Sequence, residues 1–333
     1  MKRKIAKQAA SAALFLLISA LLLNTVGLAL RPVRTDFGAV WKPYLAEPKN
    51  SLDYLYLGSS YAYCDVNPCL VYSVSGLTGY VMAGPEQTLS IAYWYLKEAL
   101  RTQTPKTVLI EASALGFQPY QNYTQINVGY MPAGFNKLRA VFSASEPDLR
   151  TGLLFELYFY HSRWKNVSLS EMAQSLLPGK TDTLKGYTSV EGTFNDISDG
   201  PFQREDPDEA LYAENYAWLC KILELCVKKG IRPVVVFHPT YSRFSPTFYD
   251  RVGTDLARDW PDISYCNWSE DLEPSGLNPA SDFYDPGHLN QSGATRFSVW
   301  LGDFLTSQLS LSPRAQSSDN TAAWRSAASV WTT

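Results

Sequence analysis

In the segment LDYLYLGSSYAYCDVNP (Leu52–Pro68), a short apolar run leads directly into a Gly-Ser-Ser turn. The run Tyr54–Leu57 is continuous and apolar, a pattern that predicts a strand buried in a parallel sheet. A turn at the end of such a strand places Ser60 at the carboxyl edge of the sheet, where open α/β folds bind their ligands. The same serine can also be only a turn former or a helix cap.

Segments of the same type recur along the chain and alternate with amphipathic segments. Short apolar runs at Gly79–Ala83, Thr107–Ala112 and Arg232–Phe237 predict three more buried strands. Apolar residues at helical spacing predict helices over Glu86–Arg101 and Asp208–Gly230, the second ending at a glycine. Alternating strands and helices are typical of a mostly parallel sheet that is covered by helices on both faces.

The domain that contains these strands is predicted to span residues 36–311. Between Gly116 and Pro207 the alternation is interrupted by a region rich in Tyr, Asn, Pro and Gly. We interpret 116–207 as an insertion over the carboxyl edge of the sheet. The final segment, Ser312–Thr333, is small and polar, which predicts a disordered tail.

The first 35 residues predict a cytoplasmic basic tip and a membrane anchor. An almost uncharged run, Ala9–Leu30, follows four basic residues within the first seven positions. As a helix this run covers about 30 Å, the thickness of a bilayer core. The basic flank predicts a cytoplasmic N-terminus and an extracytoplasmic domain. A cleaved signal peptide is the alternative, although its apolar region is normally only about 7–15 residues long. Both interpretations export the domain.

Composition and charge exclude several classes of partner and site. A net charge of −3 and the lack of a long basic run give no prediction of nucleic-acid binding. The five cysteines form no C-x-x-C pair, so that neither a zinc site nor a thioredoxin motif is predicted. A Cys64–Cys69 disulfide and five unpaired thiols remain alternatives. No cofactor and no metal are predicted.

A candidate base for Ser60 comes from the segment SDFYDPGHLNQSG, in which Asp285 stands three residues before His288. The Pro-Gly turn between them lets the carboxylate reach the imidazole Nδ1–H, which leaves Nε2 free to take a proton from a hydroxyl. The alternative is that Asp285 caps the turn and His288 is a surface residue. Asp282 lacks a histidine at the same spacing and is expected to be a solvated loop carboxylate.

Together, the Gly-Ser-Ser and D-x-x-H blocks resemble the SGNH/GDSL hydrolase superfamily, and more closely its membrane-anchored DltD-like and alginate O-acetylation (AlgJ/AlgX-like) bacterial members. The resemblance spans most of Leu52–Leu305 and implies a three-layer α/β/α sandwich of the flavodoxin-like type. It also implies that Ser60 is the nucleophile and that Asp285 and His288 complete a catalytic triad. Ser59 stands where the superfamily's Gly-Asp-Ser block has its Asp.

An oxyanion hole is predicted less completely than the triad. The resemblance implies that the backbone N–H groups of Ser60 and Gly84 bind the oxyanion, although Gly84 can also be a plain turn residue. The superfamily's Gly-x-Asn-Asp block is missing, and Leu115 stands where its Asn donor is expected. Gln87 is a candidate replacement, with a solvent-facing helical glutamine as the alternative. Glu111 is left without a role.

Candidate substrate contacts are His238, His161 and Arg163. His238 ends an apolar run at the same predicted sheet edge as Ser60, but it can also be a polar residue that simply closes a strand. His161 and Arg163 lie among aromatic residues in the predicted insertion, where a packed structural histidine is the alternative. The 21 Tyr and 9 Trp residues of the chain suit stacking on sugar rings.

These features predict a membrane-anchored extracytoplasmic serine esterase or O-acyltransferase that forms an acyl-enzyme. The resemblance implies a cell-envelope or exported polysaccharide as substrate and an acyl donor that comes from a membrane-bound acyltransferase partner. The alternative is a catalytically inactive carbohydrate-binding or scaffold protein that keeps the fold, which the missing Asn block favours.

Overall fold

The computed structural model describes residues 2–35, 37, 39–120, 122–195 and 200–332. They form two compact units, one combining Met1–Thr35 with Ser145–Pro178 and a larger one combining Asp36–Ala144 with Gly179–Thr333. Small parts of the ranges predicted from the sequence, namely residues 1, 36, 38, 121, 196–199 and 333, lie outside the described residues.

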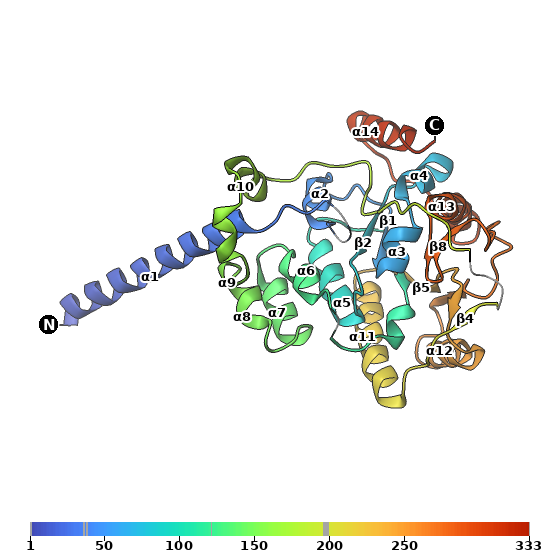
Figure 1. Cartoon of the computed structure of the whole chain (residues 1–333), viewed down its shortest axis with the longest axis horizontal. Helices are drawn as coiled ribbons and strands as arrows, with labels where there is room; N and C mark the ends of the chain where they lie inside the picture. The colour runs from blue at the N-terminus through green and yellow to red at the C-terminus, as the bar shows by residue number, and fades with distance from the viewer. Residues whose placement is uncertain (1, 36, 38, 121, 196–199, 333) are drawn as a thin grey trace. The chain divides into compact units, whose positions relative to one another are not determined.

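A five-stranded parallel sheet forms the centre of the larger unit (Figure 1). Its strand order is β2-β1-β3-β5-β7, so the order reverses between β1 and β3. The strands are β1 (Tyr54–Gly58), β2 (Gly79–Ala83), β3 (Thr107–Glu111), β5 (Arg232–Phe237) and β7 (Ser264–Asn267). All residues of β1, β2 and β3 are buried, which explains why their sequences are continuously apolar. Of the five strands in this sheet, only β7, a half-buried edge strand, lacks such a run and was not predicted.

Helices cover both faces of this sheet, which confirms the predicted three-layer α/β/α fold. On one face α5 (Leu89–Ala99) packs against α11 (Glu209–Lys228), and on the other α4 (Pro68–Ser75) packs against α13 (Gln291–Ser307). Crossovers between parallel strands are right-handed. Because β2 and β3 lie on opposite sides of β1, the helices that connect the strands on the two sides cover opposite faces of the sheet. The remaining helices of this unit are α2 (Trp41–Ala46), α3 (Ser60–Asp65), η1 (Ser113–Gly116), α6 (Thr124–Gly129), α7 (Phe135–Ser143), α12 (Pro246–Asp259) and α14 (Ser318–Ser329).

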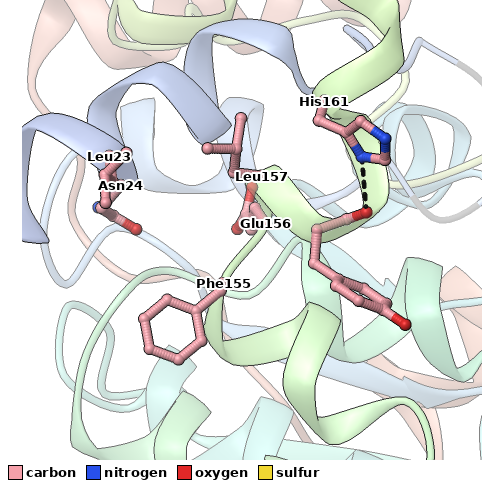
Figure 2. A pocket seen from close by; sticks show the side chains of 7 residues that line it. Leu23, Asn24, Phe155, Glu156, Leu157 and His161 are labelled. Carbon is pink, nitrogen blue, oxygen red and sulfur yellow. Dashed lines mark hydrogen bonds between the residues drawn. The ribbon is translucent and has the colours of Figure 1, made fainter.

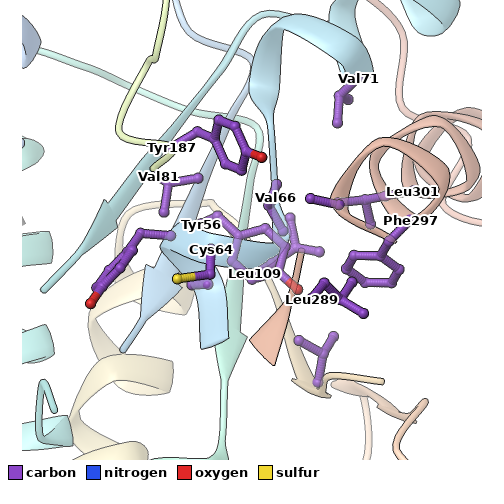
Figure 3. Close-up of a cluster of buried hydrophobic side chains, with 14 of the residues drawn as sticks. Tyr56, Cys64, Val66, Val71, Val81, Leu109, Tyr187, Leu289, Phe297 and Leu301 are labelled. Atoms are coloured by element: carbon purple, nitrogen blue, oxygen red, sulfur yellow. The ribbon is translucent and has the colours of Figure 1, made fainter. Parts of the chain in front are cut away.

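The core on the α13 face joins strands, helices and the segments that carry the site. Figure 3 shows Tyr56 and Leu109 of the sheet together with Val66, Phe297 and Leu301. All five are fully buried. Because Leu289 belongs to the same cluster, the segment next to His288 is fixed by the core of the domain.

The C-terminal segment differs from the predicted disordered tail. It contains α14, whose Trp324 is 1% exposed and packs on Tyr72 of α4. Before this helix, the Arg314 backbone N–H donates to the buried carboxylate of Asp53 at 2.9 Å. The prediction of disorder is wrong because a polar composition conceals one apolar helix face that α4 covers.

The region 116–207 is also organised differently from a single insertion. Its helices α6 and α7 belong to the larger unit, whereas Ser145–Pro178 belongs to the smaller one. That part contains α8 (Arg150–Leu154), α9 (Leu157–Tyr160), η2 (His161–Lys165) and α10 (Leu169–Leu176). Two short parallel strands in the larger unit, β4 (Phe202–Gln203) and β6 (Ser242–Arg243), lie outside the main sheet.

The smaller unit begins with α1 (Lys2–Leu30), a single helix that is long and apolar enough to cross a membrane. Most of its side chains are exposed, and only Gly27, Ala29 and Leu30 near its end are buried. A helix buried in a protein core would show the opposite pattern.

The five cysteines are all unpaired thiols, so the predicted alternative of a Cys64–Cys69 disulfide is not formed. Both thiols are buried, and the Cys69 Sγ donates to the Thr183 carbonyl.

Candidate active site

The end of β1 places Ser60 at the point where the strand order reverses. Ser60 is the first residue of α3 and directly follows β1 and the helix cap Ser59. Gly58 packs so closely that a Cβ there would lie 2.7 Å from Ala62 and 2.8 Å from Glu111 of β3. A residue with a side chain at position 58 would therefore push β1 and β3 apart. Doubly wound sheets bind their ligands at this reversal point.

Ser60, His288 and Asp285 form a continuous hydrogen-bonded chain. His288 Nε2 lies 2.7 Å from Ser60 Oγ, although the two residues are 228 positions apart. On the other side of the ring, His288 Nδ1 lies 2.8 Å from Asp285 Oδ1 and 2.9 Å from Oδ2. Asp285 ends β8 (Phe283–Asp285) and His288 begins β9 (His288–Leu289), and the two residues face each other in this antiparallel pair. The arrangement has the connectivity of a serine, base and orienter.

The turn between Asp285 and His288 fixes the carboxylate. Its Oδ1 accepts the backbone N–H groups of Gly287 at 2.7 Å and His288 at 2.9 Å. Burial acts to raise the pKa of Asp285, but the hydrogen bonds from His288 and the turn outweigh burial and lower it. For His288, burial acts to lower the pKa, and the hydrogen bond and charge of Asp285 more than reverse this effect, so that the pKa is raised. Asp285 thus stabilises the protonated form of the base.

Two neighbours of His288 were not identified from the sequence. The Tyr61 ring stacks on the imidazole with centroids 5.2 Å apart and planes at 20°. Arg204 donates to the Tyr61 hydroxyl at 3.1 Å, and its guanidinium lies 4.1 Å from the centre of the Phe244 ring. Tyr61 is adjacent to Ser60 in sequence and could have been proposed from that fact. Arg204 lies in an irregular region that carries no such signal.

Asp65, His238 and Tyr56 form a buried chain of polar side chains next to the site. The Asp65 Oδ1 accepts the backbone N–H of Leu289 at 3.0 Å, and its Oδ2 lies 3.0 Å from His238 Nδ1. His238 Nε2 lies 2.6 Å from the Tyr56 hydroxyl. Burial lowers the pKa of His238 to about 4, so the ring is neutral, and one of its nitrogens donates while the other accepts.

The prediction that His238 contacts substrate is therefore wrong. The residue is 1% exposed and both ring nitrogens are engaged inside the domain. The sequence placed no carboxylate near it, because Asp65 stands 173 positions away and only the fold brings them together. His238 belongs to the polar chain that holds the β9 backbone.

The structure shows how the predicted oxyanion residues are packed. Gly84 directly follows β2, and a Cβ there would lie 2.1 Å from the Asn127 Oδ1 of α6. Gln87 is buried and precedes α5, and its Nε2 donates to the Met82 carbonyl at 3.3 Å. The alternative of a solvent-facing helical glutamine is thus wrong, and the oxyanion roles of Gly84 and Gln87 stay predictions.

Ser59 and Ser60 have different environments although they are adjacent. The Ser59 hydroxyl is buried and has no hydrogen-bond partner among the described residues, and its backbone carbonyl accepts the N–H groups of Ala62 and Tyr63. Ser59 therefore starts α3 through its backbone, while only Ser60 reaches an imidazole.

His161 and Arg163 belong to the smaller unit, and their hydrogen bonds are made there. His161 Nδ1 lies 3.1 Å from the Tyr158 carbonyl, and Arg163 donates to the Leu30 carbonyl at the end of α1 and to Glu171. Arg163 thus caps a helix, and its predicted role in substrate binding stays a prediction, as does that of His161.

Asp282 is not the solvated carboxylate that the sequence suggested. It is fully buried, accepts the Asn278 backbone N–H at 2.9 Å and accepts the Ser292 hydroxyl at 3.0 Å. Arg296 of α13 lies 3.3 Å from the same group. Asp282 ties the start of α13 to the loop before β8, so it holds structure near the site without touching the triad.

Comparisons with known proteins add little to this geometry. No protein-family model matches the chain, and no curated protein matches it. One solved structure that is similar is described as a "putative acylhydrolase" from Bacteroides fragilis, with 11% identity, a TM-score of 0.40, and coverage of 80% of this chain and 93% of that chain. A likeness at this level carries no argument about function, which therefore rests on the site itself.

Proposed function

We propose that this protein is a serine acyl hydrolase or O-acyltransferase of the SGNH type. The observation that supports it most directly is the 2.7 Å contact between Ser60 Oγ and His288 Nε2, with Asp285 on the opposite ring nitrogen. A hydroxyl, a base and an orienting carboxylate in this order activate serine for attack on an acyl carbonyl.

The proposed reaction has two halves. His288 takes the Ser60 proton as Oγ attacks the acyl carbon, and then gives it to the leaving alcohol. The acyl-enzyme is resolved when His288 activates an acceptor hydroxyl, which gives an esterase if the acceptor is water and an acyltransferase if it is a sugar. The backbone N–H groups of Ser60 and Gly84 are the proposed oxyanion donors, each contributing about 3 kcal/mol in comparable sites.

The proposed setting is the outer face of a bacterial membrane. We propose that α1 is a single-pass anchor with its N-terminus in the cytoplasm, because basic residues precede its apolar part. A tethered domain of this kind is suited to modify cell-envelope or exported polysaccharide. We propose that the acyl group comes from a membrane-bound acyltransferase partner.

A fluorophosphonate probe on the full-length protein tests the proposal, because such probes label only activated serines. Labelling should be lost in Ser60→Ala and His288→Ala and kept in Ser59→Ala, since the Ser59 hydroxyl bonds to no group in the part of the chain that the structure describes. Labelling that survives Ser60→Ala would identify another nucleophile. A folded wild-type protein that is never labelled would favour the non-catalytic binding protein.

A further inference from the structure

Exposed apolar side chains are concentrated in one short part of the chain. Among the described residues, Ser145–Pro178 has seven large hydrophobic side chains that are exposed. The larger unit has twelve, although its chain is several times longer. The seven are Leu154, Phe155, Tyr158, Trp164, Leu169, Leu176 and Leu177. Leu169 is 84% exposed and Phe155 is 64% exposed. Such density marks a surface that is covered by something other than water.

Ser145–Pro178 is bonded to the end of α1 by an ion pair and by hydrogen bonds. Glu156 forms an ion pair with Arg31 at 3.1 Å in which both side chains are largely buried. Arg163 donates to the Leu30 carbonyl, and the Ser175 hydroxyl donates to the Arg31 carbonyl at 2.8 Å. The two hydrogen bonds satisfy backbone carbonyl groups that the end of a helix leaves without a partner inside the helix.

The packing between α1 and this segment is tight further into the helix as well. A Cβ on Gly27 would lie 2.8 Å from the backbone nitrogen of Leu157. One turn earlier, Leu23 and Asn24 line a groove of about 310 Å³ together with Phe155, Leu157 and His161 (Figure 2). The segment therefore contacts the last two turns of α1 rather than only its end.

The depth of these contacts follows from the length of the uncharged part of α1. No charged residue stands between Lys7 and Arg31, and 23 helical residues cover about 34 Å, slightly more than the roughly 30 Å of a bilayer core. Leu23 lies about 12 Å before Arg31 along the helix. If α1 crosses the membrane, Leu23 and the groove beside it lie at the level of the lipid acyl chains.

We propose that Ser145–Pro178 is a second membrane-contacting surface, which inserts into the leaflet on the side of the exported domain. Phe155 and Tyr158 would lie among the acyl chains, and Trp164 with Lys165 at the level of the headgroups. Arg163, next to Trp164, bonds to Leu30 where the span ends, which supports that level. Aromatic residues with neighbouring Lys and Arg are typical of the membrane interface.

Lipid fits this surface better than a protein partner because Leu23 of α1 lines the same groove as Phe155 and Tyr158, and all three side chains are exposed. Leu14, Phe15, Leu21 and Leu22 are all exposed on that helix. The inference goes beyond the proposed acyl chemistry but shares with it the assumption that α1 crosses the membrane.

Site-specific photo-crosslinking tests the inference on the full-length protein. Benzoylphenylalanine replaces Phe155 or Tyr158 in the test variants. Leu16 is the control position within the span. Val227 of α11, which is 55% exposed in the larger unit, is the matched apolar control. The variants are reconstituted in vesicles of phosphatidylcholine and phosphatidylglycerol that contain an alkyne-tagged lipid. Lipid adducts at positions 155 and 158 should be within a few-fold of those at position 16 and at least tenfold above those at position 227.

The controls separate the ways in which the inference can fail. If position 16 forms lipid adducts but positions 155 and 158 form no more than position 227, the second membrane surface is overturned and the anchor is retained. A lack of adducts at position 16 would overturn both, while serine labelling would report on the chemistry independently. In native membranes, conjugates of position 155 with protein and without lipid would assign the surface to a protein partner and overturn the inference.

Discussion

The Asp65 carboxyl group accepts the backbone N–H of Leu289 at 3.0 Å, one residue after His288. Asp65 is the last residue of α3, and Ser60 is the first. One short helix therefore carries the candidate nucleophile and also the group that fixes the strand of the candidate base. The 2.7 Å distance between Ser60 and His288 thus depends on α3 as a rigid unit.

Loss of the Asp65 side chain should weaken both the fold and the site. In Asp65→Ala the Leu289 N–H and the His238 ring both lose their buried hydrogen-bond partner, which should cost about 3 kcal/mol or more. We expect this loss in the free energy of unfolding in urea and a decrease of at least tenfold in the rate of fluorophosphonate labelling. Asp65→Asn keeps an acceptor oxygen and should be milder. Asp303→Ala, an exposed change on α13, should stay within about 0.5 kcal/mol.

Removing Ser60 and removing the orienting function of Asp285 should not have additive effects. Asp285→Asn leaves the nucleophile but no longer holds the imidazole in the right tautomer, a change that cost about 10⁴-fold in a serine protease. We expect both single variants to lose nearly all hydrolysis of p-nitrophenyl acetate and the double variant to be no worse than Ser60→Ala. Asp303→Asn is the matched control, since Asp282 is buried and its change would disturb α13. Full activity of Asp285→Asn would contradict the triad.

The pH dependence of hydrolysis should follow the raised pKa of His288. The base works only when neutral, so the rate should rise with pH, with a midpoint above the usual value of about 6.5. The charge of Arg204 acts to lower this pKa, so Arg204→Gln should move the midpoint to higher pH. A rate that stays constant between pH 5 and 9 would argue against His288 as the base.

The topology of α1 can be measured with a reporter fused after Arg34. We expect a reporter that acts only outside the cytoplasm to be active there and to sediment with the membrane fraction, because the basic residues precede the apolar run. Recovery of a processed and soluble reporter would show a cleaved signal peptide, in which case export stands and the anchor does not.

The C-terminal helix α14 should contribute to the stability of the larger unit. Trp324→Ala removes a fully buried ring that packs on Tyr72, a change that costs about 3–5 kcal/mol in protein cores. Thermal unfolding of the full-length protein measures this loss, and the neighbouring exposed change Arg325→Ala serves as the control. Equal melting temperatures for the two variants would mean that α14 does not pack on the domain.

Much of the sheet and the three residues of the candidate triad were predictable because their signals are local. A strand buried on both faces must be continuously apolar, so β1, β2, β3 and β5 were each located within one residue. The tetrapeptide from Asp285 to His288 carries its own turn, and the backbone of that turn brings the carboxylate to the ring. For Ser60, the position directly after a strand predicted the edge of the sheet, and the resemblance to the SGNH/GDSL superfamily implied the role of nucleophile.

Other features depended on contacts between segments that are far apart in sequence, so no local pattern could predict them. His238 looked available for substrate until Asp65 and Tyr56 were found on its two nitrogens. The polar composition of Ser312–Thr333 predicted disorder, although α4 covers its one apolar face. The attachment of Ser145–Pro178 to α1 likewise rests on pairs such as Arg31 and Glu156, 125 positions apart. Periodicity within a window reports which side of an element is buried, but it carries no information about the partner that buries it.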